Sequence, residues 1–314
     1  MLQYTIRKVL AAIPIVLAVS LIVFVILHMT PGDPIRILIG FGSGGYSGGD
    51  IEASQMDVLR AKWGLDQPLH IQYLKWLGNI LRGDMGNSIR FRSPVWPLIQ
   101  ARLMPTILLG LFAYAIAIAM AFPLGIISAL RQNSVVDYSS TGFSLFGMSM
   151  PSFWLGLMLI FLLSLKWRLL PTSGMGGWKT FIMPGFVMGF GLAGGLTRMI
   201  RSSLLEVLRQ DYITTARSKG LIERVVIVKH AFRNASIPIV TMFGFYLAYF
   251  LSGAVLTETI FAWPGLGRLA YQSLSSRDYP VVQAIVLIGA VCVVLANLIT
   301  DLIYGFVDPR IRYD

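Results

Sequence analysis

Six long apolar segments dominate this sequence and constrain its fold more than any other feature. Each is long enough for a helix to cross about 30 Å of hydrocarbon, which takes about 20 predominantly apolar residues. We therefore predict an all-α, polytopic membrane protein with about six transmembrane helices. The segments lie at about 9–29, 104–130, 139–165, 181–200, 236–261 and 281–306.

The composition agrees with a membrane protein and argues against a soluble one. The 314 residues are 55% hydrophobic and 13% charged, whereas a soluble domain carries about 25% charged residues. The net charge of +11 would suit a nucleic-acid-binding protein, but the basic residues lie in the connections between apolar segments rather than in one stripe. Positive cytoplasmic loops explain this excess, so we predict no nucleic-acid partner.

The most basic connection, residues 198–240, lies between the fourth and fifth apolar segments. Loops that carry an excess of Lys and Arg are cytoplasmic in membrane proteins. Arg7 and Lys8 also precede the first segment, and six spans would return the chain to that side. We therefore predict that both termini are cytoplasmic. The basic connection holds eight cations against three acids: Arg198, Arg201, Arg209, Arg217, Lys219, Arg224, Lys229 and Arg233 against Glu206, Asp211 and Glu223.

The first apolar segment resembles a signal peptide in having a basic start. It is long for the apolar part of a signal peptide, however, and no small-x-small cleavage site follows it. We interpret residues 1–30 as a cytoplasmic N-terminus and a retained first helix. The connection 131–137 then lies inside, and the connections 166–179 and 263–280 lie outside, although these two also carry some positive charge.

Residues 31–99 form the one sizeable polar region, and its positive and negative charges nearly balance. Because it lacks the basic bias and follows an N-inside helix, it is predicted to be extracytoplasmic. Its aromatic residues indicate a small packed cap at the membrane interface, with a helix near Glu52–Trp63. The pattern Gly40-x-Gly42-x-x-Gly45 matches a dinucleotide-binding fingerprint, but no strand precedes it, which favours a flexible loop. Residues 100–314 are predicted to form a five-helix core.

A short helix is predicted at the centre of the basic connection. Asp211 can cap a helix over 212–219, and Gly220 can end it. Such a helix is only about 12 Å long and would not persist alone in water. We therefore expect another protein to hold it, and we expect force to enter the membrane there.

The sequence contains no motif of an enzyme or of a metal site. It has no G-x-x-x-x-G-K-[ST] and no H-E-x-x-H, and the stretch Gly147-Met148-Ser149-Met150-Pro151 lacks the second glycine of a G-x-S-x-G elbow. Cys292 is the single cysteine, so no Cys/His ligand set is expected. We predict a non-catalytic chain that binds no metal and no cofactor of its own.

Few charges lie in the apolar segments, and all of them are near segment ends: Glu258, Asp301, Arg198 and Arg201. Charged residues in spans are functional candidates, but anchoring at the interface is the favoured interpretation for these four. The chain thus lacks the mid-span ionisable residue expected of a proton- or sodium-coupled carrier. A transporter of this kind would take its energy from a partner.

A series of short motifs runs along the sequence: Pro31-Gly32-Asp33-Pro34, Gly64-Leu65-Asp66-Gln67-Pro68, Gly83-Asp84-Met85-Gly86, Ser149-Met150-Pro151-Ser152-Phe153-Trp154, Asp211-Tyr212-x-x-Thr215-Ala216-Arg217-x-Lys219-Gly220, His230-Ala231-x-Arg233-Asn234-Ala235-x-x-Pro238, Glu258-Thr259-Ile260-Phe261-x-Trp263-Pro264-Gly265-Leu266-Gly267-Arg268, Arg277-Asp278-Tyr279-Pro280 and Asp308-Pro309-Arg310-Ile311-Arg312. In these motifs and their order the chain resembles, over essentially its whole length, a permease subunit of the bacterial dipeptide/oligopeptide/nickel class of ABC importers.

This resemblance implies a location in the prokaryotic inner membrane and a set of partners. They are a second homologous permease that forms a heterodimer with this chain, two ATPase subunits that bind ATP and Mg, and an extracytoplasmic solute-binding protein. The family's docking pattern, E-A-A-x-x-x-G, is modified here, because Thr214 and Thr215 replace the glutamate and the first alanine. The implied coupling loop is 201–235. Its ATPase-coupling residues are Asp211, Tyr212, Thr215, Ala216, Arg217, Lys219 and Gly220, supported by His230, Arg233, Asn234 and Pro238.

The resemblance also places the landing surface for the binding protein, or an outer gate, on the cap and on the loop 263–280. Arg217 and Lys219 would suit carboxylates on the ATPase or, alternatively, cytoplasmic lipid. Substrate would pass between the second to fifth spans of two permeases, and no substrate-binding residue can be assigned. Peptides are favoured over nickel chelates, glutathione or sugars; a self-sufficient carrier or channel and a membrane scaffold are competing hypotheses of a different class. The outer residues concerned are Asp33, Trp263, Pro264, Gly265, Arg268 and Asp278.

Overall fold

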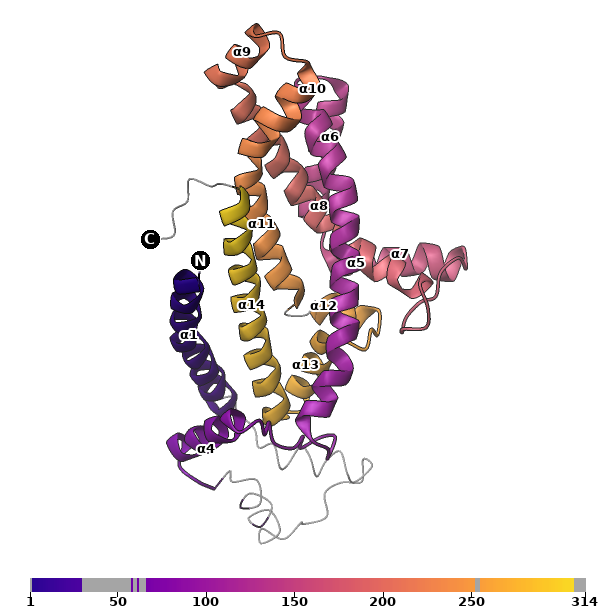
Figure 1. The fold of residues 1–314 in the computed structure, drawn as a ribbon. Coiled ribbons are helices and arrows are strands. Elements are labelled where there is room, and N and C mark those ends of the chain that lie inside the picture. The colour runs from indigo at the N-terminus through magenta and orange to yellow at the C-terminus, as the bar shows by residue number, and fades with distance from the viewer. Residues whose placement is uncertain (1, 30–57, 59–60, 62–65, 252–254, 308–314) are drawn as a thin grey trace.

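A computed structural model of the chain describes residues 2–29, 58, 61, 66–251 and 255–307 (Figure 1). The described part is helical, and it contains no strand beyond one isolated bridge between Asn87 and Pro94. The predicted all-α class is therefore confirmed. The helices are α1 (Leu2–Met29), α4 (Leu69–Leu81), α5 (Val95–Leu130), α6 (Val135–Ser149), α7 (Ser152–Leu159), the π-helix η1 (Ile160–Lys166), α8 (Lys179–Leu208), α9 (Asp211–Ser218), α10 (Glu223–Val225), the π-helix η2 (Val226–Phe232), α11 (Arg233–Leu251), α12 (Val255–Ile260), α13 (Leu266–Ser275) and α14 (Tyr279–Val307).

The helix α8 lies at the centre of the bundle, between α5, α6 and α11 (Figure 1). Small residues let the backbones approach closely, as is usual in membrane helix packing. A Cβ atom at Gly189 would lie 2.6 Å from the backbone oxygen of Ala113 in α5, and one at Gly194 would lie 2.7 Å from that of Ser144 in α6. The three helices α5, α6 and α8 therefore form one tightly packed unit.

The apolar core of this unit joins α5, α8 and α11. Three alanines of α5 present a smooth surface to branched side chains of α8, and α11 closes the cluster with one isoleucine. All of these residues are buried, so the contact excludes both lipid and water. The members are Ala113, Ala117, Ala121, Leu192, Ala193, Leu196, Ile200 and Ile239.

Four single helices in the described part are long and apolar enough to span a membrane, and a bent pair brings the number to five. The third predicted span, 139–165, is not one straight helix. The chain bends by 99° between α6 and α7, because Pro151 lacks the N–H that would continue α6 and holds Met150 in an extended conformation with ψ 122°. The structure therefore shows a sharp bend within the predicted span, and the crossing of the membrane by 139–165 stays a prediction.

The fifth predicted span, 236–261, falls on two helices, α11 and α12, and residues 252–254 between them lie outside the described part. The count of six spans stays a prediction. The boundary predicted at residue 99 falls inside α5, because the helix begins at Val95 directly after Pro94. Val95 and Ile99 are fully buried against Leu266 and other residues of the outer end, so α5 continues into the region assigned to the cap.

The outer region is described only in part. The helix predicted near Glu52–Trp63 and the glycine-rich loop lie almost wholly outside the described residues. The helix α4 crosses the end of α1 (Figure 1), where the ring of Tyr73 lies 5.3 Å from that of Phe24 and its hydroxyl is 2.9 Å from Ser20 Oγ.

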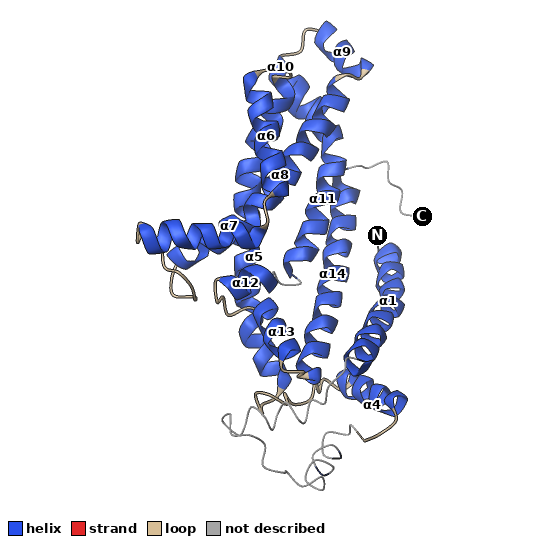
Figure 2. Cartoon of the chain, turned by 180° about the vertical axis from the view of Figure 1, so that it is seen from behind, coloured by secondary structure: helices blue, strands red, loops and turns tan. Residues whose placement is uncertain are grey.

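The two ends of the molecule differ. The helices α9 and α10 lie at one end, and α4 and α13 lie at the other, in both views (Figures 1 and 2). The start of α1 and the end of α14 both point toward the α9 end. Lys8 in α1 and Asp301 in α14 form an ion pair at 3.0 Å. Asp301, predicted to be an interfacial anchor, therefore links two helices.

Candidate functional site

The short helix predicted in the basic connection is present as α9. It covers Asp211–Ser218, one residue earlier than predicted, and it ends before Gly220, whose φ of +74° suits glycine. Asp211 is the first helical residue and not the cap; Gln210 occupies the cap position and makes no side-chain capping bond. The charge of Asp211 instead lies in the first turn, where it interacts favourably with the helix dipole.

The inner face of α9 is held by its own chain. Ile213 is fully buried and Ala216 is 7% exposed. They pack in an apolar cluster with residues from the ends of α5 and α8 and from η2 and α11, namely Ala129, Leu204, Val226, Ala231 and Ala235. Tertiary packing within the chain therefore supplies stabilisation that so short a helix lacks alone, and the expectation that another protein also holds it stays a prediction.

The outer face of α9 is open and polar. Asp211, Tyr212, Thr215, Arg217 and Lys219 are all exposed. The hydroxyl of Thr215 donates to the carbonyl oxygen of Asp211 at 3.0 Å, so its hydrogen is already used within the helix. Of the predicted coupling residues, only Ala216 lies on the buried side.

Arg217 already has a carboxylate partner in its own chain. Its Nη2 lies 2.7 Å from Glu223 Oε1, and its Nε lies 3.2 Å from Oε2. The guanidinium lowers the pKa of the Glu223 carboxyl through these hydrogen bonds. The pair closes the turn after α9, a role that the sequence prediction did not include.

One of the predicted supporting residues, Asn234, contacts α9, and a second, His230, contacts Asn234. Asn234 Nδ2 donates to the Tyr212 hydroxyl at 2.9 Å, and the same amide lies 3.0 Å from the carbonyl oxygen of His230. His230 thus takes part through its backbone. Arg233 is exposed at the start of α11, and Pro238 lies farther along that helix, away from the turn that meets α9. Their predicted supporting role stays a prediction.

A buried ion pair below α9 was missed by the sequence analysis. Asp137 at the start of α6 accepts hydrogen bonds from Arg201 Nε at 2.6 Å and Nη2 at 2.8 Å. It also accepts from Ser128 Oγ at the end of α5 and from the Asn133 N–H. The interpretation of Arg201 as an interfacial anchor was therefore wrong. The signal that could have revealed the pair was Asp137 itself, a lone acid in an otherwise basic inner turn.

Glu258 also does not act as an interfacial anchor, because it is only 1% exposed. Its Oε1 accepts from the Thr106 hydroxyl at 2.7 Å and its Oε2 from the Arg268 N–H at 2.9 Å. The Leu266 N–H in turn donates to Thr106 Oγ1 at 2.7 Å. This network fixes the start of α13 to α5.

Three of the six predicted outer docking residues, Trp263, Gly265 and Asp278, are too buried to form a landing surface. Trp263 is fully buried and donates from Nε1 to the Pro105 carbonyl oxygen at 3.0 Å. Gly265 is buried, and a Cβ atom there would collide with the Glu258 carboxylate. Pro264 and Arg268 are half-buried, and Asp33 lies outside the described residues.

Asp278 is the clearest correction among these residues, since its side chain is fully buried. It accepts from the Ser88 hydroxyl, from the Ile89 N–H at 3.0 Å and from the Arg90 N–H at 3.2 Å. Burial raises the pKa of its carboxyl group, although the hydrogen bonds oppose this. Asp278 therefore ties the loop before α5 to the start of α14 and supports the outer surface from beneath.

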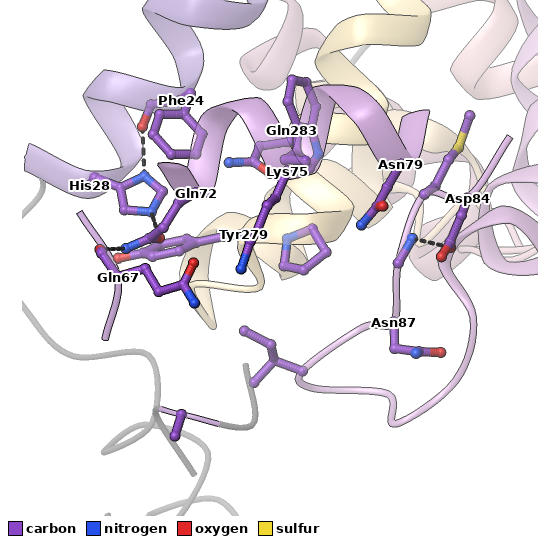
Figure 3. A pocket seen from close by; sticks show the side chains of 16 residues that line it. Phe24, His28, Gln67, Gln72, Lys75, Asn79, Asp84, Asn87, Tyr279 and Gln283 are labelled. Carbon is purple, nitrogen blue, oxygen red and sulfur yellow. Dashed lines mark hydrogen bonds between the residues drawn. The ribbon is translucent and has the colours of Figure 1, made fainter. Parts of the chain in front are cut away.

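A cavity of about 550 Å³ lies at the outer end, between α1, α4, the loop before α5 and the start of α14 (Figure 3). Its walls carry amides, a lysine and aromatic rings. His28 Nε2 lies 3.1 Å from Gln72 Oε1, and Asp84 accepts from the Gly86 N–H at 2.8 Å. Side chains labelled in the close-up are Phe24, His28, Gln67, Gln72, Lys75, Asn79, Asp84, Asn87, Tyr279 and Gln283.

Comparison with known proteins assigns almost the whole chain to one family. Residues 121–313 match the model of the binding-protein-dependent transport system inner membrane component. Residues 1–110 match the model of the N-terminal part of the same transport system's membrane component.

Several curated relatives align over their full length. The chain is 44% identical to the oligopeptide transport system permease protein AppB of Bacillus subtilis, over 100% of both chains. It is 40% identical to the dipeptide transport system permease protein DppB of Escherichia coli, over 100% of this chain and 99% of the relative. It is 39% identical to the glutathione transport system permease protein GsiC of Escherichia coli, over 100% of both chains.

Solved structures show the same fold at low sequence identity. A chain of the MetNI methionine ABC transporter in an inward-facing conformation matches with a TM-score of 0.57 and 16% identity, over 67% of this chain and 96% of that one. A chain of an amino acid ABC transporter matches with a TM-score of 0.53 and 15% identity, over 66% and 92%. Together with the family models, these findings show that the chain belongs to the binding-protein-dependent transport system inner membrane components, as a permease of the ABC importer type.

Proposed function

We propose that this chain forms half of the translocation pathway of an ATP-driven importer of di- or oligopeptides. In this proposal it pairs with a second, homologous permease, and two ATPase subunits bind ATP and Mg at the α9 end. A solute-binding protein delivers the peptide at the α13 end. The chain itself is non-catalytic and carries no cofactor. The names of AppB and DppB support the substrate class.

The geometry of α9 carries the proposal. Its Ile213 and Ala216 face is fixed to four other helices, while its polar face is presented outward at one end of the molecule. A helix fixed on one side and open on the other transmits a push from a partner to the elements that hold it. Tyr212 and Lys219 on the open face are the best candidates for direct contact with an ATPase, since Arg217 already pairs with Glu223.

The push would reach the membrane part by two routes. The helix α9 follows α8 almost directly, and η2 with α11 follows it through α10. Closure of the ATPases on α9 would therefore shift α8 together with α5 and α6, and would shift α11 through η2. Rigid-body movements of packed helices of this kind open one side of a pathway and close the other.

The orientation that we propose places the α9 end and both termini in the cytoplasm. The excess of Lys and Arg around α9 supports this orientation, and so does the common direction in which the start of α1 and the end of α14 point. The outer end would then present the exposed residues of α4 and α13 to the binding protein, supported by the buried network of Asp278 and Glu258.

A second substrate class is favoured by one relative. The glutathione permease GsiC is 39% identical over the full chain, which is close to the values for the peptide permeases. Glutathione is itself a short peptide with free carboxylates, so a peptide pathway would also suit it. Uptake assays with glutathione and with a dipeptide, run side by side on the same transporter, distinguish the two substrate classes.

The test uses the complete transporter, co-expressed with its neighbouring permease and ATPase genes and reconstituted in proteoliposomes. Tyr212→Ala and Lys219→Glu change the open face of α9, and Tyr138→Ala at an exposed position of α6, outside the proposed partner surfaces, is the matched control. We expect both α9 variants to reduce co-purification of the ATPases or peptide-stimulated ATP hydrolysis at least about tenfold, as loss of central interface contacts does. Normal assembly and stimulation in both variants would contradict the proposal, and so would peptide uptake driven by an ion gradient without ATP.

A further inference from the structure

The exposed side of α8 is unusual for a membrane helix. All residues of α8 are described, and only Lys179, Arg198, Ser202 and Glu206 among them are exposed. None of the strongly exposed large apolar side chains belongs to α8, although some of its apolar residues, such as Met188 and Leu205, are partly exposed. The helices that face lipid differ sharply, since α1 exposes Leu10 to 59% and α14 exposes Leu295 to 49%.

The last three of these exposed residues lie on one face, because they are spaced four apart along the helix. Two glycines on the same face mark its borders. A Cβ atom at Gly191 would lie 3.7 Å from the Gly147 oxygen of α6, and one at Gly195 would lie 2.9 Å from the Tyr246 hydroxyl of α11. The polar face therefore continues from positions where α8 approaches α6 and α11. We call this surface, defined by Arg198, Ser202 and Glu206, the α8 lane.

The lane leads to a cavity at its α9 end. This cavity measures about 510 Å³ and takes in Ser202, Glu206, Arg209 and Gln210, together with Gln132 from the turn between α5 and α6. The apolar Leu205 also lines it, and its other side chains are polar. The lane and the cavity share Ser202 and Glu206, whose polar side chains lipid tails would not solvate.

Arg198 lies about 15 Å along the axis from the end of α8 at Leu208. Within the described part of the chain its guanidinium makes no hydrogen bond or ion pair, whereas the neighbouring Arg201 is fully engaged by Asp137. The sequence analysis interpreted Arg198 as an interfacial anchor. Its exposed position on a polar face favours contact with water or a partner charge over contact with lipid tails, since a charged arginine is strongly unfavourable in hydrocarbon.

We propose that the α8 lane lines the water-filled solute pathway, and that Arg198 receives the carboxylate of the transported solute. This inference deepens the proposed function, on which its peptide part rests. The guanidinium fork binds a carboxylate through two parallel hydrogen bonds, and every unmodified short peptide carries one at its C-terminus. Glu206, two turns along the same face, has the opposite charge and can interact with the ammonium group of the same solute after it passes.

The first experiment tests whether the lane is accessible to water and whether it favours anions over cations. It needs no peptide. The assembled transporter is prepared with Cys292→Ala, so that Ser202→Cys provides the single thiol of this chain, one turn from Arg198, and with Glu206→Gln, which removes the opposite charge one turn away on the other side. Its reaction rates with a sulfonate and with a trimethylammonium methanethiosulfonate reagent are compared at low salt. A unit charge about 6 Å away attracts one reagent and repels the other, so we expect the sulfonate to react roughly tenfold faster.

Two variants of Arg198, each combined with Ser202→Cys, identify the source of the ratio between the two reaction rates. Arg198→Gln should bring the ratio close to one, and Arg198→Lys should keep most of it. Ile22→Cys in α1, which is 57% exposed on an apolar surface, is the control that neither charged reagent should modify. Protection of Ser202→Cys from both charged reagents, with labelling only by a lipophilic maleimide, would overturn the proposal, because the lane would then face lipid or the second permease. An unchanged ratio in Arg198→Gln would overturn the role of Arg198.

The second experiment adds the solute. A dipeptide with a free C-terminus should slow sulfonate labelling of Ser202→Cys during ATP-driven turnover, and the same dipeptide with a C-terminal amide should not. If both slow it equally, Arg198 does not recognise the carboxylate. Peptide uptake by the wild-type transporter is measured in parallel. A charge-selective lane in a transporter that takes up no peptide would show that the proposed substrate class, and not the lane, is wrong.

Discussion

Arg201 of α8 and Asp137 of α6, which are 64 positions apart in the sequence, are joined by two parallel hydrogen bonds of 2.6 and 2.8 Å. Asp137 is 3% exposed and Arg201 is 28% exposed. Because Asp137 also accepts from Ser128 of α5, one carboxylate connects three helices. It does so close to the point where α8 leads into α9, so that α5, α6 and α8 are expected to move together when α9 is pushed.

Replacing Asp137 with asparagine should weaken both the fold and this connection. Removing one partner of a buried ion pair costs about 3–5 kcal/mol, and partial exposure of Arg201 lowers our expectation to about 2–3 kcal/mol. The decrease is measured as the unfolding free energy of the detergent-purified transporter. The double variant Asp137→Asn/Arg201→Gln leaves no buried charge and should recover part of the stability. Equal stability of the wild type and Asp137→Asn would contradict the structure.

Coupling should respond differently from stability in the same variants. The double variant restores part of the stability but not the bidentate connection. We therefore expect it to keep basal ATP hydrolysis and to lose several-fold in the hydrolysis stimulated by loaded binding protein. Full stimulation in the double variant would show that the ion pair is structural only.

Gly220 should be required for its backbone conformation alone. Its φ is +74°, and a Cβ atom there would meet nothing within 4 Å. Gly220→Ala should therefore cost about 1–2 kcal/mol through the left-handed conformation, and Gly220→Asn should cost less. Gly78 in α4 is the matched control, because it also has open space but lies within a helix. Gly78→Ala should be neutral or slightly stabilising. Thermal unfolding and protease sensitivity of the loop after α9 provide the measurement.

The pair of Arg217 and Glu223 predicts a pH dependence of the turn after α9. The folded-state pKa of Glu223 is lowered from its ordinary value of 4.5 by Arg217. The pair therefore stabilises the turn above the unfolded-state pKa, and this stabilisation is lost as the pH falls through the lowered folded-state pKa. Both side chains are about half exposed, so the effect should be under about 1 kcal/mol. Hydrogen exchange in the turn should be faster in Glu223→Gln than in the wild type at pH 7, and the difference should disappear at low pH.

Gly194 should not tolerate even one additional methyl group. A Cβ atom there would lie 2.7 Å from the Ser144 backbone oxygen, whereas one at Gly191 would meet only an oxygen at 3.7 Å. Gly194→Ala should separate α6 from α8 and cost about 1–3 kcal/mol, although alanine is the better helix former. Gly191→Ala lacks the collision and should be neutral or stabilising by up to about 1 kcal/mol. An equal loss of stability in Gly194→Ala and Gly191→Ala would contradict the close approach of α6 and α8 at Gly194.

The helices themselves were largely predictable from the sequence. The length of an apolar segment indicates that it lies in lipid, and a basic connection indicates a loop that lies in water. The end of α9 at Gly220 was predictable for a local reason, since glycine suits a positive φ. The bend at Met150 and Pro151 was also signalled by the proline, but the length of the apolar segment was given more weight than the break. Hydropathy carries no information on the direction of the chain. One straight span and two helices at 99° to each other therefore give the same kind of apolar segment in the sequence.

The roles of the charged residues were not predictable in this way. Glu258 and Arg201 look like interfacial anchors because both lie near the ends of apolar segments. Their partners, Thr106 and Asp137, are 152 and 64 positions away, and only the packing of the helices brings them together. The burial of Trp263 was not predictable either. Its motif was predicted to form a docking surface, whereas its side chain is fully buried.

The loop before α5 should be destabilised when Asp278 is replaced, because the buried Asp278 carboxylate holds this loop against the start of α14. Asp278→Ala would leave the Ile89 N–H and the Ser88 hydroxyl without their acceptor, and hydrogen bonds to a charged group contribute about 1.5–3 kcal/mol each. We expect a loss of about 3 kcal/mol or more in stability and weaker binding of the solute-binding protein, since residues 88–90 would detach from α14. Ser88→Ala removes one donor and keeps the other contacts, so its loss should be about 1–2 kcal/mol. If Asp278→Ala lowered the affinity for the binding protein without loss of stability, Asp278 would contact that protein directly, and the docking role first predicted for it would be correct after all.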